Sequence, residues 1–413
     1  MGSLFAIITI WCLLLGAESK THEGDAEVLK ELKRSLEPAS VIPGSCVSSW
    51  DFTVDPCDNL FGEKFTCGFR CDVVVSGLSR VTELALDQAG YVGSFSFTWN
   101  LPFLQTLDLS KNHFSARIPD SFSNLTRLRR LSLSSNSFFG KIPPSLGALP
   151  SLEELYLDNN NLRGTIPPGF HNLKRLELQS NKLNTPLPNL DHFTNLKYLD
   201  LSDNSIAGVL PALLPASLVQ ISIRNNNLNG VLSNESFRNL TRLQVVDFSS
   251  NRMSGVIPSV FFELPSLQQL TLSFNEFRKV GEPYSGVESR SGLIAVDLSN
   301  NRLEGFLPSF MAMIPKLSSL SLEKNEFTGR IATQFAVKTV FPETGVSPLG
   351  RLLLGGNYLV GGIPRPLLAL KRDSANVSLV DNCLYRCPHI FFFCQGGQQK
   401  SSTQCKRFVS TSD

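Results

Sequence analysis

The sequence of 413 residues lacks cysteine over the whole stretch between Cys71 and Cys383, although it holds nine cysteines in all. It also lacks a strong charge of either sign, because 38 Lys and Arg stand against 36 Asp and Glu, for a net charge of +2. Without a basic surface the chain is not expected to bind nucleic acid. After the N-terminus, no segment approaches the roughly 18 apolar residues that a membrane helix needs.

Signatures of catalysis are also missing. None of the five histidines lies beside a Cys or Ser in an arrangement typical of an activated nucleophile: His22, His113, His171, His192 and His389. The sequence contains no phosphate-binding glycine loop and no kinase motif. We therefore expect neither an enzyme nor a protein that uses a cofactor.

The N-terminus reads MGSLFAIITIWCLLLGAES, in which an apolar run from Leu4 to Leu15 precedes the small residues Ala17 and Ser19. This pattern predicts a secretory signal over residues 1–19, although no Lys or Arg precedes the run. A buried helix is the alternative. No hydrophobic tail for a lipid anchor ends the sequence, so we expect a secreted, extracellular protein without a transmembrane segment.

The other eight cysteines form one group near each end: Cys46, Cys57, Cys67 and Cys71, then Cys383, Cys387, Cys394 and Cys405. An even number in a secreted chain predicts two disulfide-stapled caps. The C-x3-C spacing in both groups superficially suggests zinc, but disulfides are favoured in a secreted protein, and we expect no metal. Each group permits more than one pairing. We favour Cys57–Cys67 with Cys46–Cys71, and Cys383–Cys405 with Cys387–Cys394.

Between the two groups, the pattern L-x-x-L-x-L-x-x-N recurs, mostly at intervals of 21 to 26 residues. Its asparagines are Asn112, Asn136, Asn160, Asn181, Asn204, Asn226, Asn251, Asn275, Asn301, Asn325 and Asn357. A leucine pair in L-x-L points to one side of a short strand, and the residues between them point to the other side. The asparagine amide can satisfy backbone groups of neighbouring coils. This is the periodicity of leucine-rich repeats, whose coils bury their leucines only by stacking.

Two further features accompany the repeat. Glycine stands four residues after the asparagine in eight of the eleven units, and Ile-Pro or Leu-Pro often follows. The ends contain SSWDFTVDPC, FTCGFRC and NCLYRCPHIFFFCQGGQQKSSTQC. Together these segments resemble the plant-specific class of leucine-rich repeats and the caps of plant leucine-rich-repeat receptor-like proteins, over residues 20–405. The resemblance implies cell-surface recognition of peptides or proteins, often with a co-receptor kinase. A receptor-like protein ordinarily continues through a membrane helix, which this sequence does not show.

We therefore expect an α/β repeat solenoid: a curved, right-handed leucine-rich-repeat superhelix with a parallel concave β-sheet and disulfide caps. The expected parts are a signal at 1–19, an N-terminal cap at 20–78, a solenoid of about 13 units at 79–382 and a C-terminal cap and tail at 383–413. In the first cap, DAEVLKELKRSL predicts a helix with Asp25 as N-cap. Because the solenoid separates the cysteine groups, we expect bridges only within each group.

The residues that face outward from the L-x-L strands form the concave surface. One cluster on four successive coils combines aromatic and charged side chains: Glu154, Tyr156, Arg175, Glu177, Tyr198 and Arg224. Exposed Tyr and Arg together are typical of interface hot spots, so we expect this cluster to bind the ligand. The alternative is a solvated sheet face whose charges pair across coils, as Glu154 and Arg175 could.

Two coils depart from the repeat, at 278–292 and at 325–357, and such interruptions are either binding loops or tolerated insertions. Four sequons predict glycosylation outside the L-x-L strands, at Asn124, Asn234, Asn239 and Asn376. Glycans there would leave the concave face open.

The function that these observations favour is extracellular recognition of a peptide or protein ligand, in signalling or defence. The protein would reside in the extracellular space or cell wall, associated with the plasma membrane only through a partner. The runner-up is a secreted inhibitor of microbial cell-wall-degrading enzymes, similar to plant polygalacturonase inhibitors. A wall-associated structural protein is a third class, but no proline-rich tail is visible.

Overall fold

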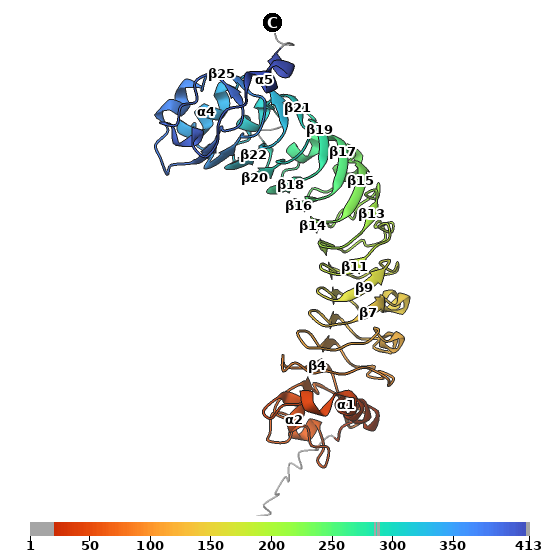
Figure 1. Cartoon of the computed structure of the whole chain (residues 1–413). Helices are drawn as coiled ribbons and strands as arrows, with labels where there is room; N and C mark the ends of the chain where they lie inside the picture. Colours follow the sequence, from red (N-terminus) through yellow and green to blue (C-terminus); the bar gives the residue numbers. More distant parts are fainter. Residues whose placement is uncertain (1–19, 285, 287–289, 410–413) are drawn as a thin grey trace, which may run out of the picture.

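The computed structural model describes residues 20–284, 286 and 290–409, so the expected signal at 1–19 lies outside the described residues. The chain winds into a stack of coils that curves along its length, with the two caps at opposite ends (Figure 1). Within the described residues no helix is long and apolar enough to cross a membrane.

A 14-stranded sheet lines the concave side of this curve (Figure 1). Its first strand, β1 (Phe69–Arg70), is antiparallel to its neighbour, and the others are parallel. In spatial order they are β4 (Glu83–Ala85), β5 (Thr106–Asp108), β6 (Arg130–Ser132), β8 (Glu154–Tyr156), β10 (Arg175–Glu177), β12 (Tyr198–Asp200), β14 (Gln220–Ser222), β16 (Val245–Asp247), β18 (Gln269–Thr271), β20 (Ala295–Asp297), β22 (Ser319–Ser321), β24 (Arg351–Leu353) and β26 (Asn376–Ser378). The expected leucine-rich-repeat solenoid with a parallel sheet is thus confirmed.

The leucines of the repeat stack inside the coils. Leu131, Leu155 and Leu176 are register partners on successive strands, and all three side chains are fully buried. Because every coil contributes its leucines at the same height, the core is one continuous column along the solenoid. No single coil could bury these side chains alone.

The asparagines form the hydrogen-bond ladder that the repeat predicts. Asn160 accepts the Phe138 N–H at Oδ1 (2.9 Å), and its Nδ2 donates to the carbonyls of Leu133 (2.9 Å), Leu157 (3.1 Å) and Asp158 (3.0 Å). One side chain therefore satisfies four backbone groups and joins its own coil to the preceding one. Buried backbone groups without such partners would be costly.

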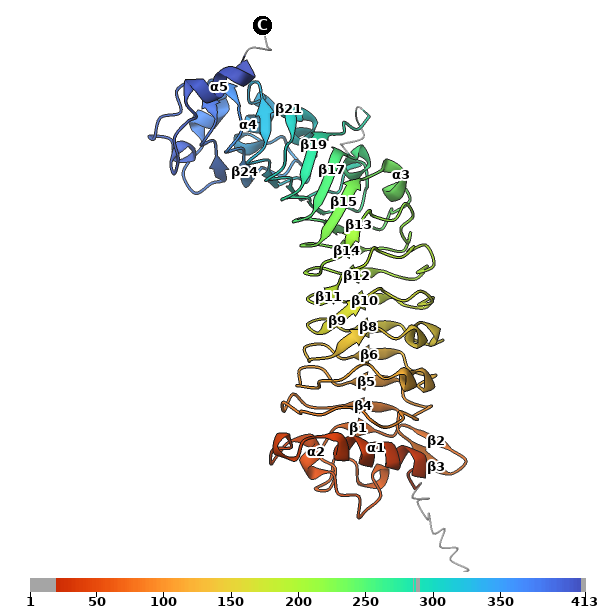
Figure 2. The same cartoon turned by 45° about the vertical axis from the view of Figure 1, so that its right-hand side comes forward.

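Short strands follow the asparagines and form a second set of parallel sheets on the flank of the solenoid (Figure 2). They are β7 (Phe139–Lys141), β9 (Asn161–Gly164), β11 (Lys182–Leu183), β13 (Ala207–Gly208), β15 (Asn227–Val231), β17 (Arg252–Ile257), β19 (Glu276–Val280), β21 (Glu304–Phe306), β23 (Glu326–Thr328), β25 (Val360–Gly361) and β27 (Cys383–Leu384). Their glycines are needed: Gly230 has φ +83°, and a Cβ there would lie 2.8 Å from Val209 Cγ1 of the preceding coil.

Short helices cover the opposite, convex side, where α3 (Asn234–Phe237) is visible in Figure 2. The described part of the solenoid includes the 3₁₀ helices η3 (Asp120–Asn124), η4 (Pro144–Ala148), η5 (Ser259–Phe262), η7 (Ser309–Met313) and η8 (Arg365–Ala369). The interrupted coil at 325–357 contains a longer helix in this row, α4 (Thr333–Val340). The other interruption, at 278–292, lies partly outside the described residues.

The N-terminal cap packs α1 (Glu23–Ser35) and α2 (Cys46–Ser49) with the hairpin of β2 (Val73–Val75) and β3 (Leu78–Arg80), alongside η1 (Pro38–Ser40) and η2 (Cys57–Asn59). The C-terminal cap contains η9 (Phe392–Cys394) and α5 (Ser402–Val409). Each of the four disulfides lies within one cap, as expected, and those of the C-terminal cap are Cys383–Cys405 and Cys387–Cys394, as favoured.

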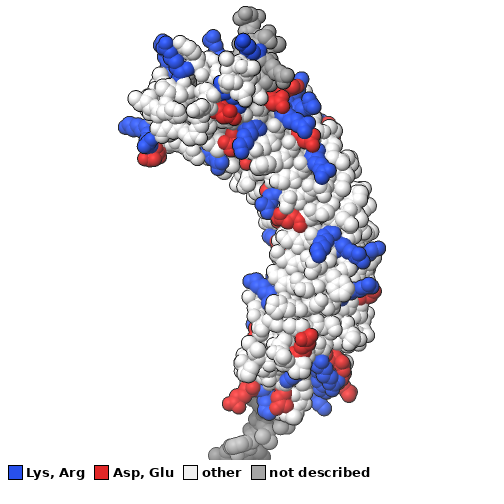
Figure 3. Space-filling view, in the orientation of Figure 1, with Lys and Arg blue, Asp and Glu red and all other residues white. Residues whose placement is uncertain are grey.

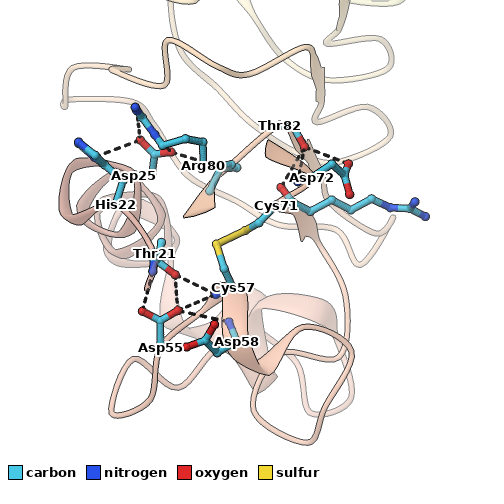
Figure 4. The surroundings of a disulfide bond; sticks show 12 residues. Thr21, His22, Asp25, Asp55, Cys57, Asp58, Cys71, Asp72, Arg80 and Thr82 are labelled. Atoms are coloured by element: carbon cyan, nitrogen blue, oxygen red, sulfur yellow. Dashed lines mark hydrogen bonds and ion pairs between the residues drawn. A yellow bond between two sulfur atoms is a disulfide. The ribbon is translucent and has the colours of Figure 1, made fainter. Parts of the chain in front are cut away.

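The pairing favoured for the N-terminal cap is wrong. The bridges are Cys46–Cys67 and Cys57–Cys71, with Cα atoms 5.0 and 5.8 Å apart. The Trp50 indole N–H donates to the Cys67 carbonyl (2.9 Å), which holds this segment beside α2, where Cys46 begins the helix. Asp55 accepts the N–H of Thr21 (2.9 Å) and of Cys57 (3.1 Å), and this keeps Cys57 near Cys71 (Figure 4).

Asp25 is not the N-cap of α1, since His22 has that role and accepts the Gly24 N–H at 3.2 Å. Asp25 is fully buried and accepts two hydrogen bonds from the Arg80 guanidinium (3.0 and 2.7 Å) and one from the Val81 N–H (2.9 Å; Figure 4). The helix of the cap is thereby tied to the strand β3 and to the start of the solenoid.

Adjacent asparagines provide a matched test of the ladder. Asn160→Ala should lower the free energy of unfolding by about 2–4 kcal/mol, because buried backbone groups lose their partners. Asn161 is exposed, and Asn161→Ala should stay within about 0.5 kcal/mol of wild type. Urea unfolding of both variants checks this. Equal losses would mean that the ladder does not stabilise the coils.

The buried pair of the cap gives a second prediction. Asp25→Asn removes the charge opposite a buried Arg80 and should cost about 3–5 kcal/mol. Glu27→Gln is the control, because Glu27 makes only exposed pairs with Lys30 and Arg34 and should change stability by less than about 1 kcal/mol. Thermal unfolding compares the two, and a small effect of Asp25→Asn would contradict the inferred role of the pair.

Candidate functional site

Five of the six residues predicted to bind the ligand lie on three adjacent strands of the concave sheet. Glu154 and Tyr156 are on β8, Arg175 and Glu177 on β10, and Tyr198 on β12. In the sheet register, Arg175 lies between Glu154 and Tyr198, and Glu177 lies opposite Tyr156. We call these five residues the concave cluster.

Glu154 and Arg175, the pair that the alternative of a solvated face allowed, do not bond to each other. Arg175 Nη1 donates to Glu177 Oε1 at 2.7 Å, on the same strand. Glu154 Oε2 instead accepts from Arg130 Nη1 (2.8 Å) and from the Tyr156 hydroxyl (3.0 Å). Residues two apart on a strand point to the same face, so the Glu177 carboxylate can reach Arg175, while the Glu154 carboxylate is engaged by Arg130 on the preceding strand.

Each arginine also covers a tyrosine ring. The guanidinium carbon of Arg130 lies 4.5 Å from the centre of the Tyr156 ring, and that of Arg175 lies 4.0 Å from the centre of the Tyr198 ring. Arg130, on β6, therefore belongs to the site, although the sequence prediction left it out. The signal that could have found it is its position, because it occupies the same place in its coil as Glu154, Arg175 and Tyr198.

Arg224 does not join the cluster. It follows β14, and its Nη2 donates to Asp203 Oδ2 at 2.8 Å, at the turn after β12. Its side chain is half exposed at 52%. The structure thus places Arg224 at the edge of the concave sheet, in a pair of its own.

The electrostatics of the cluster follow from this pairing. Burial, together with the hydrogen bond to Glu154, raises the pKa of Tyr156. Burial alone would lower the pKa of Arg175, but its hydrogen bond to Glu177 raises it overall. Both groups keep their ordinary protonation states at neutral pH. With Arg130 added to the concave cluster, two arginines balance two glutamates, so the site offers aromatic area and fixed polar edges without net charge.

Other acidic residues on the concave strands serve the turns that follow them. Asp200 Oδ1 accepts the Ser202 N–H at 2.9 Å, and Asp247 accepts the Ser249 N–H at 3.0 Å. Asp108 and Asp297 do the same for the serines two residues later. Across the face shown in Figure 3, acidic and basic side chains are interspersed. Within the described residues, no group of three His, Cys, Asp or Glu could hold a metal ion.

One sequon departs from expectation. Asn124 lies in η3, Asn234 in α3 and Asn239 shortly after α3, all off the concave sheet. Asn376, however, is the first residue of the concave strand β26 and is exposed. The sequence reading missed this because the last repeat is degenerate. A glycan on Asn376 would stand at the C-terminal end of the concave face.

The interrupted coil at 325–357 forms a second candidate site. A hollow of about 410 Å³ lies between η7, α4 and the segment that follows α4, with mostly apolar walls. The exposed side chain of Met313 lines it, and the exposed Phe341 directly precedes Pro342, another lining residue. Lys338 also lines the hollow; it is buried, its Nζ donates to the Ile314 carbonyl at 2.6 Å, and burial lowers its pKa to about 8.

The lowered pKa of Lys338 predicts that the stability of the fold depends on pH. Its pKa falls from an ordinary 10.5 to about 8 on folding, so between these values the unfolded chain binds more protons and stability rises with pH. Lys338→Met removes this contribution. Relative to wild type, the variant should therefore lose stability as the pH rises from 8 to 10.5. The exposed Lys316→Met is the control for thermal unfolding across this range, and identical profiles for the two variants would contradict the prediction.

Comparisons with known proteins agree with this architecture. Leucine-rich-repeat family models match residues 102–162, 195–216 and 216–277. No curated protein matches the chain significantly. Among solved structures, a TDR receptor is 28% identical with a TM-score of 0.60, covering 69% of this chain and 52% of that one.

Two further structures are complexes. The plant peptide hormone receptor RGFR1 in complex with RGF2 is 27% identical with a TM-score of 0.61, covering 76% of this chain and 48% of that one. PEPR1–AtPEP1 is 26% identical with a TM-score of 0.57, covering 88% and 59%. This chain thus spans about half of the length of the structures it matches. It is a leucine-rich-repeat solenoid similar to the ectodomains of plant leucine-rich-repeat receptors.

Proposed function

We propose that this protein is an extracellular recognition protein of the plant receptor-like type, which binds a peptide or protein ligand through its concave face. The observation that carries the proposal is the concave cluster with Arg130: two tyrosine rings, each covered by an arginine, on adjacent strands of a rigid sheet. The similarity to RGFR1 with bound RGF2 supports a peptide as ligand.

The geometry suits binding for a physical reason. Tyrosine offers a large contact area at a small cost in side-chain entropy, and a ring held by a guanidinium has lost most of its freedom before the ligand arrives. Arg130 and Arg175 are themselves held by Glu154 and Glu177. The ligand therefore meets a pre-organised surface and need not displace a net charge.

The remaining assignments extend this proposal. The protein acts in signalling or defence by binding, not by catalysis, in the extracellular space or cell wall. A co-receptor kinase ectodomain is its second partner and contacts the interrupted coil near Phe341 to Leu349. The four disulfides fit an oxidising, extracellular compartment.

Variants of the tyrosines test the proposal. Tyr156→Ala and Tyr198→Ala should each weaken ligand binding by about 1–3 kcal/mol with folding intact. Tyr385→Ala is the control, because Tyr385 is an exposed tyrosine of the C-terminal cap. Charge reversal at Arg175 should mainly slow association and alter its salt dependence. Biolayer interferometry against a panel of synthetic plant peptide hormones measures all four variants.

A chain with the interrupted coil trimmed completes this experiment. It should bind the peptide normally and fail only in assembly with a co-receptor ectodomain. If the tyrosine variants bind like wild type and the trimmed chain does not bind, the concave cluster is not the ligand site. If no peptide binds but a fungal polygalacturonase is inhibited, the protein is an inhibitor of cell-wall-degrading enzymes instead.

A further inference from the structure

A row of basic residues runs along the flank of the solenoid, away from the concave sheet. Lys141 on β7, Arg163 on β9 and Lys182 on β11 are successive register partners in the three-stranded sheet of these strands, and all three are exposed. The exposed Arg117, one coil earlier, forms an isolated β-bridge with Phe139 of β7 and extends the row. Figure 3 shows Lys and Arg side chains gathered on this flank at the level of β9 and β11. We call the four basic residues the flank row.

The fold does not neutralise the charges of the flank row. Within the described part of the chain, none of its four residues makes an ion pair or a side-chain hydrogen bond. Other basic residues of these coils are paired, since Arg130, Lys174 and Arg175 each contact a glutamate. Like charges directly opposite each other on neighbouring strands repel. The row therefore weakens the fold slightly and leaves positive charge available to a partner.

Glycines allow the stems of these side chains to lie along the sheet. A Cβ on Gly140 would lie 3.4 Å from Arg117 Cγ, and a Cβ on Gly164 would lie 3.3 Å from Lys141 Cγ. Each stem thus rests on the backbone of the next coil, which restricts its motion. Neighbouring strands are ~4.8 Å apart, so the three register partners present one charge per strand over about 10 Å.

Uncharged side chains beside the row suit a sugar. Phe139 and Asn161 are register partners, and each lies two residues before a basic residue of the row, so they share its outward face. Phe139 is 43% exposed, and Asn161 is exposed as well. An aromatic ring offers an apolar surface to the CH face of a sugar ring. The amide of Asn161 can both donate to and accept from sugar hydroxyls.

The arrangement of the row determines the kind of partner. A single small anion cannot contact cations on three successive strands, whereas a linear polymer with a charge on each unit can. The aromatic ring and the amide favour a polymer of sugars over an acidic peptide. The four disulfides fit an extracellular compartment, which disfavours nucleic acid as the partner.

We propose that the flank row binds a linear anionic polysaccharide. Its carboxylate or sulfate groups contact Arg117, Lys141, Arg163 and Lys182, and a sugar ring packs against Phe139. The arginines can hold such a group through two parallel hydrogen bonds, which a lysine cannot. This site goes beyond the proposed function, because it lies on a different sheet from the concave cluster and needs no ligand there.

Biolayer interferometry of the full chain with polygalacturonate as the probe gives the first test. The triple variant Lys141→Gln/Arg163→Gln/Lys182→Gln should lose about tenfold or more in affinity, because three exposed ion pairs are lost together. Its melting temperature should not fall, since the substitutions remove repulsion between register partners. A clear loss of stability would assign the row a structural role and contradict the proposal.

A matched triple variant controls for net charge. Lys316→Gln/Arg365→Gln/Lys371→Gln removes the same number of charges from exposed residues outside the row. It should bind polygalacturonate like wild type. An equal loss of affinity in the two triple variants would mean that only the overall charge matters, and the proposal would fail.

Other probes define the ligand. Fully methyl-esterified polygalacturonate has the same sugars without the charges and should bind much more weakly. Dextran sulfate shows whether sulfate can replace carboxylate. Polyglutamate and a single-stranded oligonucleotide carry charge in other polymers and should bind more weakly than the preferred polysaccharide. Phe139→Leu keeps an apolar side chain but removes the ring, so it should weaken only polysaccharide binding, by about two- to tenfold.

Two further results would overturn the inference. If polyglutamate or the oligonucleotide binds as tightly as both polysaccharides and Phe139→Leu changes nothing, the partner is a different polyanion. If no probe binds the wild-type protein, the flank row is only a solvated face. Either result leaves the proposed concave recognition intact, because the concave cluster is not part of this site.

Discussion

The structure depends above all on the buried asparagine amide that joins each coil to the one before it. In Asn160 this side chain bonds to backbone groups of two successive coils, and the same set of bonds recurs along the solenoid, for example at Asn226 and Asn301. Because these hydrogen bonds fix the register between neighbouring coils, the concave strands align residue by residue. This alignment places side chains that are more than 20 residues apart in sequence within contact distance.

The ladder also explains why the outward residues of the concave surface fall into two groups with different roles. Some outward residues satisfy the turn that leads to the asparagine, as Asp200 and Asp247 do. Others do not support a turn and contact side chains of the concave face, as Arg175 does with Glu177 and Tyr198. Recognition has to use this second group, since a ligand that engaged the first would disturb the turns. The face available to a ligand is therefore narrower than the sheet itself and nearly neutral in charge.

Much of the fold could be predicted from the sequence because the repeat has a strict physical meaning at each position. The leucine core, the asparagine ladder and the separation of the two cysteine groups all follow from spacing alone. The pairing within the N-terminal cap could not be predicted, since it depends on where Trp50 and Asp55 hold the chain, and neither contact is periodic. The role of Asp25 was hidden for the same reason, as its partner Arg80 is 55 residues away.

The candidate site could be predicted in part. The sequence located the tyrosines and Arg175 on adjacent coils. It could not decide which charged side chains bond to one another, so Glu154–Arg175 was only one possible pair and Arg130, the actual partner of Glu154, was left out of the predicted site.

Hydroxyl-radical footprinting of the protein, with and without a bound peptide, tests the central claim most directly, because it reports the accessibility of individual side chains. The account predicts that binding reduces the oxidation of Tyr156 and Tyr198. It predicts no change at Tyr385 in the C-terminal cap or at Met313 beside α4. Protection of Met313 and Phe341 with unchanged oxidation of the concave aromatics would contradict recognition by the concave face.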